Sequence, residues 1–158
     1  MFSIIIPTYN NLDYLKLCLE SLKKNSSFNH EIIIHINEGK DGTLSYLKSS
    51  DYKTTYSKIN SGVCVAFNQA AMKASKDFIV LAHDDMYFCP NWDKVFAEEL
   101  KKMPYNKDFF LSGTMIQPFE SYINFDCGKN IKEFNEEKLL KELQKIKFKD
   151  FQGTHWQP

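Results

Sequence analysis

The chain has 158 residues, of which 43% are hydrophobic and 25% charged; this suits one globular domain and excludes a disordered chain. Twenty basic and twenty acidic residues give a formal net charge of zero, so no basic excess suggests a nucleic-acid-binding protein. The four cysteines form no C-x-x-C pair and no apolar run approaches the ~18 residues of a transmembrane segment, so we expect reduced thiols in a cytoplasmic protein.

The first part of the chain alternates predicted strands and helices. Phe2–Ile6 is a β-branched run that Pro7 closes, which predicts a first strand. Leucines then recur at steps of three and four, which predicts a helix whose first turn is capped by Asn10 or Asn11. A second strand, a polar loop and a short helix are expected at 31–36, 37–42 and 43–48.

The middle of the chain continues this alternation. Tyr52–Ser57 predicts a third strand, and Asp77–Ala82 predicts a fourth. Between them Ser61 is expected to cap a helix that carries an apolar face. That face comprises Val63, Ala66, Phe67, Ala70, Ala71 and Ala74.

The last part of the chain is less regular. Pro90-Asn91 begins a predicted helix, and Asp108–Leu111 predicts a further strand. The segment Thr114–Lys132 is expected to hold an extra short strand pair, and Asn135 to cap a final helix. The inward side chains of the first of these helices are expected to be Trp92, Val95, Phe96, Leu100 and Met103. Strands that alternate with helices favour an α/β fold with a mostly parallel sheet and helices on both faces.

Three polar loops follow predicted strands. Ligand sites of open parallel sheets lie beyond the carboxyl ends of the strands, so these loops are expected to meet at one edge. The loops are Pro7–Asn10, Asn37–Gly42 and His83–Asp85.

The adjacent carboxylates of Asp84 and Asp85 predict a site for a hard divalent cation, Mn²⁺ or Mg²⁺. A diphosphate could supply the further oxygen ligands that such a cation needs. The alternative is that the two residues only cap the next segment. His83 is expected to be a hydrogen-bonding neighbour more often than a ligand.

Other polar residues suit the remainder of a nucleotide. Tyr9 offers a ring on which a base can stack, and Glu38 can accept a hydrogen bond from a pyrimidine imide or a ribose hydroxyl. Glu38 could instead be a solvated loop carboxylate. Asn68 is either a residue that lines the pocket or an exposed one.

Three stretches together resemble the inverting family 2 glycosyltransferases of the GT-A fold over about residues 2–115: "SIIIPTYN", "EIIIHINEGKDGT" and "NSGVCVAFNQAAMKASKDFIVLAHDDMYFCPNW". The resemblance implies a three-layer αβα fold with a mostly parallel, Rossmann-like sheet. It also implies a single nucleotide-sugar-binding domain over 1–158, with a donor-binding core at 1–115 and the start of an acceptor region at 116–158.

The family's functional positions carry over only in part. The acidic second loop keeps a carboxylate at Glu38 but has Asn37 where the family often has an Asp, and Asn68 would line the nucleotide pocket. In the Asp-x-Asp-like element Ala82 replaces the first acid, which leaves the metal ligand between Asp84 and Asp85. The residues on the side of the base would be Pro7, Thr8, Tyr9 and Asn10, and His83 and Asp84 would also contact the substrate.

The catalytic base is not identified by the sequence. In the family this carboxylate comes well after the Asp-x-Asp element, and here Glu120 and Asp126 are possible but poorly placed. We therefore expect a truncated transferase that holds the donor-binding half and lacks most of the acceptor half.

The resemblance implies metal-dependent, inverting transfer of a sugar from a nucleoside-diphosphate sugar, expected to be UDP-linked, to a saccharide, a lipid-linked acceptor or another hydroxyl group. It places the protein in polysaccharide biosynthesis, without nucleic acid or a transmembrane segment, and leaves peripheral association with the inner membrane face open.

Three other functions compete with this one. A non-catalytic nucleotide-sugar-binding or interaction module would also lack a base. A nucleotidyltransferase would need a Gly-rich phosphate loop after the first strand, which this chain lacks. A phospho-acceptor signalling domain usually places its acid pair after the first strand, where this chain has Thr8 and Tyr9.

Overall fold

A computed structural model describes residues 1–103, 108–118 and 123–146 of the chain. The chain divides into two compact units, at 1–107 and 108–158. The boundary expected between residues 115 and 116 separates a donor-binding core from the start of an acceptor region, and it stays a prediction.

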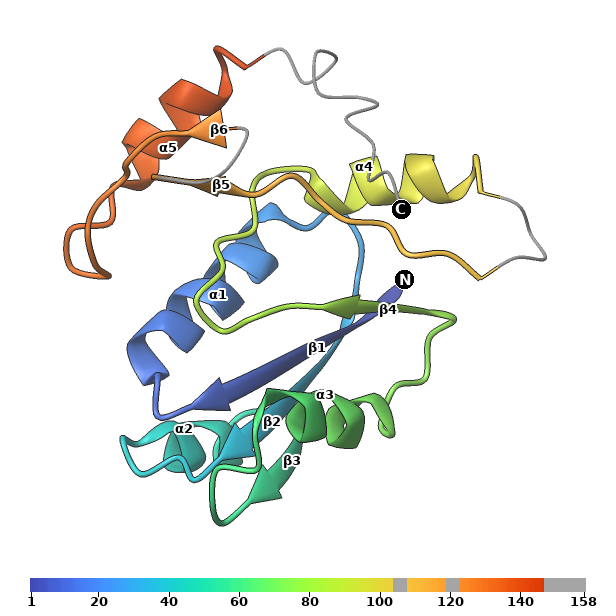
Figure 1. Ribbon diagram of the computed structural model, residues 1–158, viewed down its shortest axis with the longest axis vertical. Coiled ribbons are helices and arrows are strands. Elements are labelled where there is room, and N and C mark those ends of the chain that lie inside the picture. The colour runs from blue at the N-terminus through green and yellow to red at the C-terminus, as the bar shows by residue number, and fades with distance from the viewer. Residues whose placement is uncertain (104–107, 119–122, 147–158) are drawn as a thin grey trace. The chain divides into compact units, whose positions relative to one another are not determined.

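The first unit is built on a four-stranded sheet in which all neighbouring strands are parallel (Figure 1). The strand order is β3-β2-β1-β4, so β2 and β1 occupy the centre. This confirms the predicted α/β class and the mostly parallel sheet. The strands are β1 (Phe2–Tyr9), β2 (Glu31–Asn37), β3 (Lys53–Ser57) and β4 (Phe78–Leu81).

The first strand runs through Pro7 and ends at Tyr9, so the expected end at Pro7 was wrong. The pairing of β1 with β4 stops at Ile5, while its pairing with β2 continues to Tyr9. The Ile5 carbonyl accepts from the Ala82 amide, and Pro7, two residues further, faces the same side of the strand. Because β4 has ended there, no strand on that side needs a hydrogen bond from residue 7, and proline is tolerated although it has no N–H.

Helices cover both faces of this sheet. On one face α1 (Leu12–Asn25), α2 (Thr43–Lys48) and α4 (Trp92–Leu100) pack on a core that includes Ile4, Ile6 and Ile34. On the other face α3 (Val63–Ala71) packs on Ile5 and Ile33 (Figure 1). The alternation of Ile side chains along β1 and β2 therefore supplies two cores, one on each face.

Two predicted helix faces need correction. Val95 of α4 is 59% exposed, and Asp93 takes a buried position on that helix instead. Val63 of α3 is also exposed, and Gly62, not Ser61, is the residue that precedes its first turn. Gly62 has a φ of 83°, a conformation that glycine adopts without a steric cost.

The second unit contains β5 (Ile116–Gln117), β6 (Ile123–Asn124) and α5 (Glu136–Leu143). The expected short strand pair is confirmed, since β5 pairs with β6. The strand expected at Asp108–Leu111 is absent from the described part of the chain, where 108–115 has no regular structure. Asn135 caps α5 as predicted, because its side chain accepts from the Lys138 amide at 2.9 Å.

No helix within the described ranges combines the length and the apolar character needed to cross a bilayer.

Candidate functional site

The loops after β1, β2 and β4 meet at the carboxyl edge of the sheet, as predicted. Register pairs Tyr9 with Asn37 at the ends of β1 and β2, so the residues that follow them emerge side by side. The β4 strand ends earlier, opposite Ile5, so its following loop lies beside the last residues of β1. Asn10 and Asn11 each join the β1 loop to one of the other two loops through side-chain hydrogen bonds.

The first of these contacts joins the β1 and β2 loops. The Asn10 amide donates to Glu38 Oε2 at 3.4 Å, and its oxygen accepts from the Lys40 backbone N–H at 2.7 Å. Lys40 Nζ lies 2.8 Å from the same Glu38 oxygen. The Lys40 ammonium group holds the pKa of Glu38 below its ordinary value, and the Asn10 amide adds to this effect. Glu38 is therefore a charged acceptor at the sheet edge.

The backbone of these loops is unusual where the contact forms. Asn10 and Glu38 both adopt positive φ, 48° and 58°, which L-residues seldom do. Such conformations persist only where the surrounding structure enforces them, and they concentrate at functional sites. The strain supports a functional reading of Glu38 over a merely solvated carboxylate.

The second contact joins the β1 and β4 loops. The Asn11 amide donates to Asp84 Oδ1 at 3.2 Å. Burial raises the pKa of the Asp84 carboxyl and the Asp85 charge adds to the rise, while the Asn11 amide opposes it. The Thr8 hydroxyl also lies near Asp84 and favours its charge, but it lacks the geometry of a full hydrogen bond. A positive charge beside Asp84 would favour its ionised form further.

The rest of the β4 loop is more exposed. Asp85 and His83 are exposed, and the His83 ring meets the edge of Phe67 with centroids 5.6 Å apart. Beneath the loop, burial raises the pKa of the Cys18 thiol to about 12, with Asp84 and Asp85 adding to the rise. That thiol donates to the His83 carbonyl at 3.6 Å, so it packs under the loop as a neutral group.

The other predicted substrate residues lie at or near this edge. Pro7 and Thr8 are buried in β1, whereas Tyr9 is 48% exposed at its end. Asn68 is exposed on α3, and no hydrogen bond joins its side chain to the three loops among the described residues. The structure therefore groups Asn10 with Glu38, and Asp84 with the neighbouring Asn11, but leaves Asn68 apart from these contacts.

The sequence did not predict the contacts that three polar residues, Asn11, Asp41 and Asn37, make at these loops. The N-cap position of α1 is Asn11, but its side chain makes no capping bond. Asp41 makes it instead, accepting from the Leu12 N–H at 2.7 Å and from the Thr43 N–H at 3.1 Å. Asn37 is buried, and its oxygen accepts from both the backbone N–H and the hydroxyl of Ser61.

Of the two possible catalytic bases, only Asp126 lies within the described residues. Asp126, in the second unit, accepts from the Gly128 N–H at 2.8 Å and so caps a turn. Glu120 lies outside the described residues.

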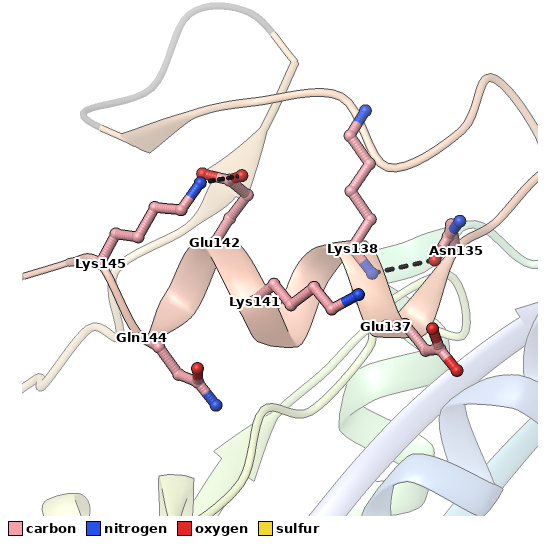
Figure 2. Close-up of a pocket in the computed structure, with 7 residues that line it drawn as sticks. All are labelled: Asn135, Glu137, Lys138, Lys141, Glu142, Gln144 and Lys145. Carbon is pink, nitrogen blue, oxygen red and sulfur yellow. Dashed lines mark hydrogen bonds and ion pairs between the residues drawn. The ribbon is translucent and has the colours of Figure 1, made fainter.

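A hollow of about 530 Å³ lies along α5, and its lining includes none of the residues predicted for the site (Figure 2). Figure 2 shows charged and amide side chains of α5 and of the residues that flank it around this hollow, with Glu142 paired to Lys145. The hollow has no buried apolar wall and no converging polar groups, which are the features of a ligand pocket. It is lined by Asn135, Glu137, Lys138, Lys141, Glu142, Gln144 and Lys145.

Comparison with known proteins gives a consistent result. A family model described as glycosyl transferase family 2 matches residues 3–150. The chain is 32% identical over 143 residues to glycosyltransferase RP339 of Rickettsia prowazekii, covering 88% of this chain and 44% of that protein. It is 28% identical over 158 residues to glycosyltransferase MG025 of Mycoplasma genitalium, covering 93% of this chain and 49% of that protein. The chain thus spans less than half of either relative's length.

A solved structure shares the fold of part of the chain. The structure of S. aureus TarS 1-349 in complex with UDP is similar with a TM-score of 0.57 and 27% sequence identity. The similarity covers 64% of this chain and 32% of that one. The likeness agrees with the GT-A type of sheet predicted from the sequence.

Proposed function

Because the chain belongs to glycosyl transferase family 2, we propose that its carboxyl-edge site binds a nucleoside-diphosphate sugar, UDP-linked, for transfer of the sugar to a hydroxyl acceptor. The acceptor would be a saccharide or a lipid-linked hydroxyl, and transfer would invert the anomeric centre. UDP in the similar TarS structure supports the choice of nucleotide.

One observation carries this proposal. Two carboxylates, Glu38 and Asp84, stand at the same sheet edge, each hydrogen-bonded to one of two consecutive asparagines. A nucleoside diphosphate presents N–H and O–H donors at one end and negative charge at the other. Glu38, a charged acceptor, suits the base or the ribose. Asp84 and Asp85 suit the diphosphate only if a cation lies between the two sets of charges.

The donor set fits such a cation, Mn²⁺ or Mg²⁺. Asp84 and Asp85 supply hard oxygen ligands, and burial disfavours the charge of Asp84 until a positive partner is present. No group of three or more His, Cys, Asp or Glu within the described residues could hold a metal, so diphosphate oxygens would have to complete the coordination. Bound there, the cation would neutralise negative charge on the leaving diphosphate.

The chain's own residues would share the remaining work. The exposed Tyr9 ring stacks on the base, and Glu38 accepts a hydrogen bond from it or from the ribose. Asn10 and Lys40 hold the Glu38 carboxylate in place. We assign no catalytic base.

Calorimetry with UDP, GDP and ADP, each with and without Mn²⁺, tests this proposal. UDP should bind most tightly, and Mn²⁺ should strengthen its binding. The variant carrying Asp84→Asn and Asp85→Asn should lose that strengthening, because the ligands are neutralised. The variant carrying Asp51→Asn and Asp77→Asn removes the same charge from exposed positions that precede β3 and β4, and should retain it.

Glu38→Gln should weaken UDP binding by about 1–3 kcal/mol if it leaves a donor poorly paired. Equal affinity for the three nucleotides, or an unchanged metal effect in the Asp84/Asp85 variant, would contradict the proposal. UDP binding without any turnover of UDP-sugars, in the presence of mixed saccharide acceptors, would favour a non-catalytic binding module instead.

A further inference from the structure

Asn11 immediately precedes α1, and its side chain makes no hydrogen bond to the helix. An asparagine at an N-cap ordinarily accepts a hydrogen bond from a backbone N–H of the first turn. The Asn11 side chain makes no such bond, and the Asp41 carboxylate accepts from the Leu12 N–H instead. Only the Asn11 backbone serves α1, through its carbonyl, which accepts from the Leu15 N–H at 3.0 Å. The Asn11 amide is therefore free for another task.

That task is a contact across 73 positions of sequence. Asn11 Nδ2 donates to Asp84 Oδ1 at 3.2 Å, and Asp84 is half-buried. The donor fixes one carboxylate oxygen of Asp84 against the start of α1. The neighbouring Asn10 makes the corresponding contact with Glu38, at the other end of the site.

We propose that Asn11 is a positioning residue for Asp84, and that it acts on the diphosphate and metal end of the site independently of the base end. This inference rests on the proposed function. Asn11 would touch neither the sugar nor the cation. It would orient the Asp84 carboxylate, which would contact the cation. Asn10 would orient the Glu38 carboxylate in the same way. Two consecutive amides would thus orient the two acidic residues separately.

The experiment measures UDP and GDP affinity, each with and without Mn²⁺, in Asn11→Ala and in Asn10→Ala. Asn11→Ala should reduce the Mn²⁺-dependent gain in UDP affinity about tenfold, in the range for loss of a hydrogen bond to a charged group. Its preference for UDP over GDP should not change. Asn10→Ala is the matched control, and it should lose part of that preference while it keeps the gain from Mn²⁺.

A purely structural role for Asn11 predicts a different pattern in the melting temperature. If its side chain served as a helix cap, Asn11→Asp would be as stable as the original chain and Asn11→Ala would be less stable, because Asp caps as well as Asn. If its amide serves Asp84, Asn11→Asp places two carboxylates together and should melt lowest of the three chains, below Asn11→Ala, which only loses the hydrogen bond.

Each outcome decides a separate question. If the original chain binds UDP with a gain from Mn²⁺ that Asn11→Ala retains in full, the positioning role is overturned and the proposed function stands. Loss of the gain in Asn10→Ala as well would overturn the independence of the two ends. If the original chain binds no nucleoside diphosphate, the proposed function and this inference fail together.

Discussion

Helices α1 and α5 both begin after an asparagine, and the two asparagines do different things. Asn135 accepts from the Lys138 N–H and so caps its own helix. Asn11 leaves its helix to be capped by Asp41, thirty positions away in sequence, and reaches Asp84. The same residue type at the same helix position is thus structural in one unit and available to a binding site in the other. What separates them is whether another residue supplies the cap.

The largest expected effect comes from removal of that external cap. Asp41→Ala should lower the free energy of unfolding by about 1–2 kcal/mol, because the Leu12 and Thr43 N–H groups both lose a charged acceptor. Urea denaturation measures the change. Asp51→Ala is the control, since Asp51 is exposed and its side chain makes no hydrogen bond or ion pair within the described residues. Equal stability of the two variants would show that Asp41 does not cap α1.

A smaller and more local effect is expected at the helix that caps itself. Asn135→Ala should cost about 1 kcal/mol, and the loss should be confined to α5. Amide hydrogen exchange over residues 136–143 reports it directly, and exchange in β1 and β2 should stay the same. Unchanged exchange in α5 would remove the contrast between the two asparagines.

The smallest effect should appear in the pH dependence of stability. Burial opposes the charge of Asp41, yet hydrogen bonds from Thr43 and Leu12 outweigh it and hold the pKa of this carboxyl below its ordinary value. The stabilisation is therefore present above the pKa of an unfolded Asp, about 3.9, and is lost as pH falls through the lower folded value. The difference in unfolding free energy between the original chain and Asp41→Asn should shrink from pH 6 to pH 2. A difference that grew on acidification would mean that the sign is wrong.

Much of the fold could be predicted because it depends on local patterns. The β-branched runs that become β1 and β2, and the leucine spacing of α1, are visible within windows of a few residues. The convergence of the loops followed from parallel topology alone, since the carboxyl ends of such strands share one edge. The pairing of Asn10 with Glu38 and the approach of the β1 loop to Asp84 agree with that expectation.

The features that were missed depend on partners distant in sequence. Nothing near Leu12 shows that Asp41 will cap its helix, and so the local pattern predicts a cap at Asn10 or Asn11. A local pattern likewise does not fix how deeply an apolar residue is buried. The apolar run of β4 resembles that of β2, but Leu81 is 53% exposed at the sheet edge while Ile34 is fully buried at its centre. The same limit explains the exposed Val95.

The left-handed backbone at Glu38 and Gly39 bears on how this loop can vary over evolution. A side chain at Gly39 would place its Cβ 2.9 Å from both the Ile36 and Leu44 side chains, and its φ of 71° already favours glycine. Glu38 has a φ of 58°, where Asn, Asp or Gly would be better tolerated than Glu. Selection for folding alone would therefore retain the glycine and let the glutamate drift. A glutamate maintained at this position over many generations would be the signature of selection on what the loop binds.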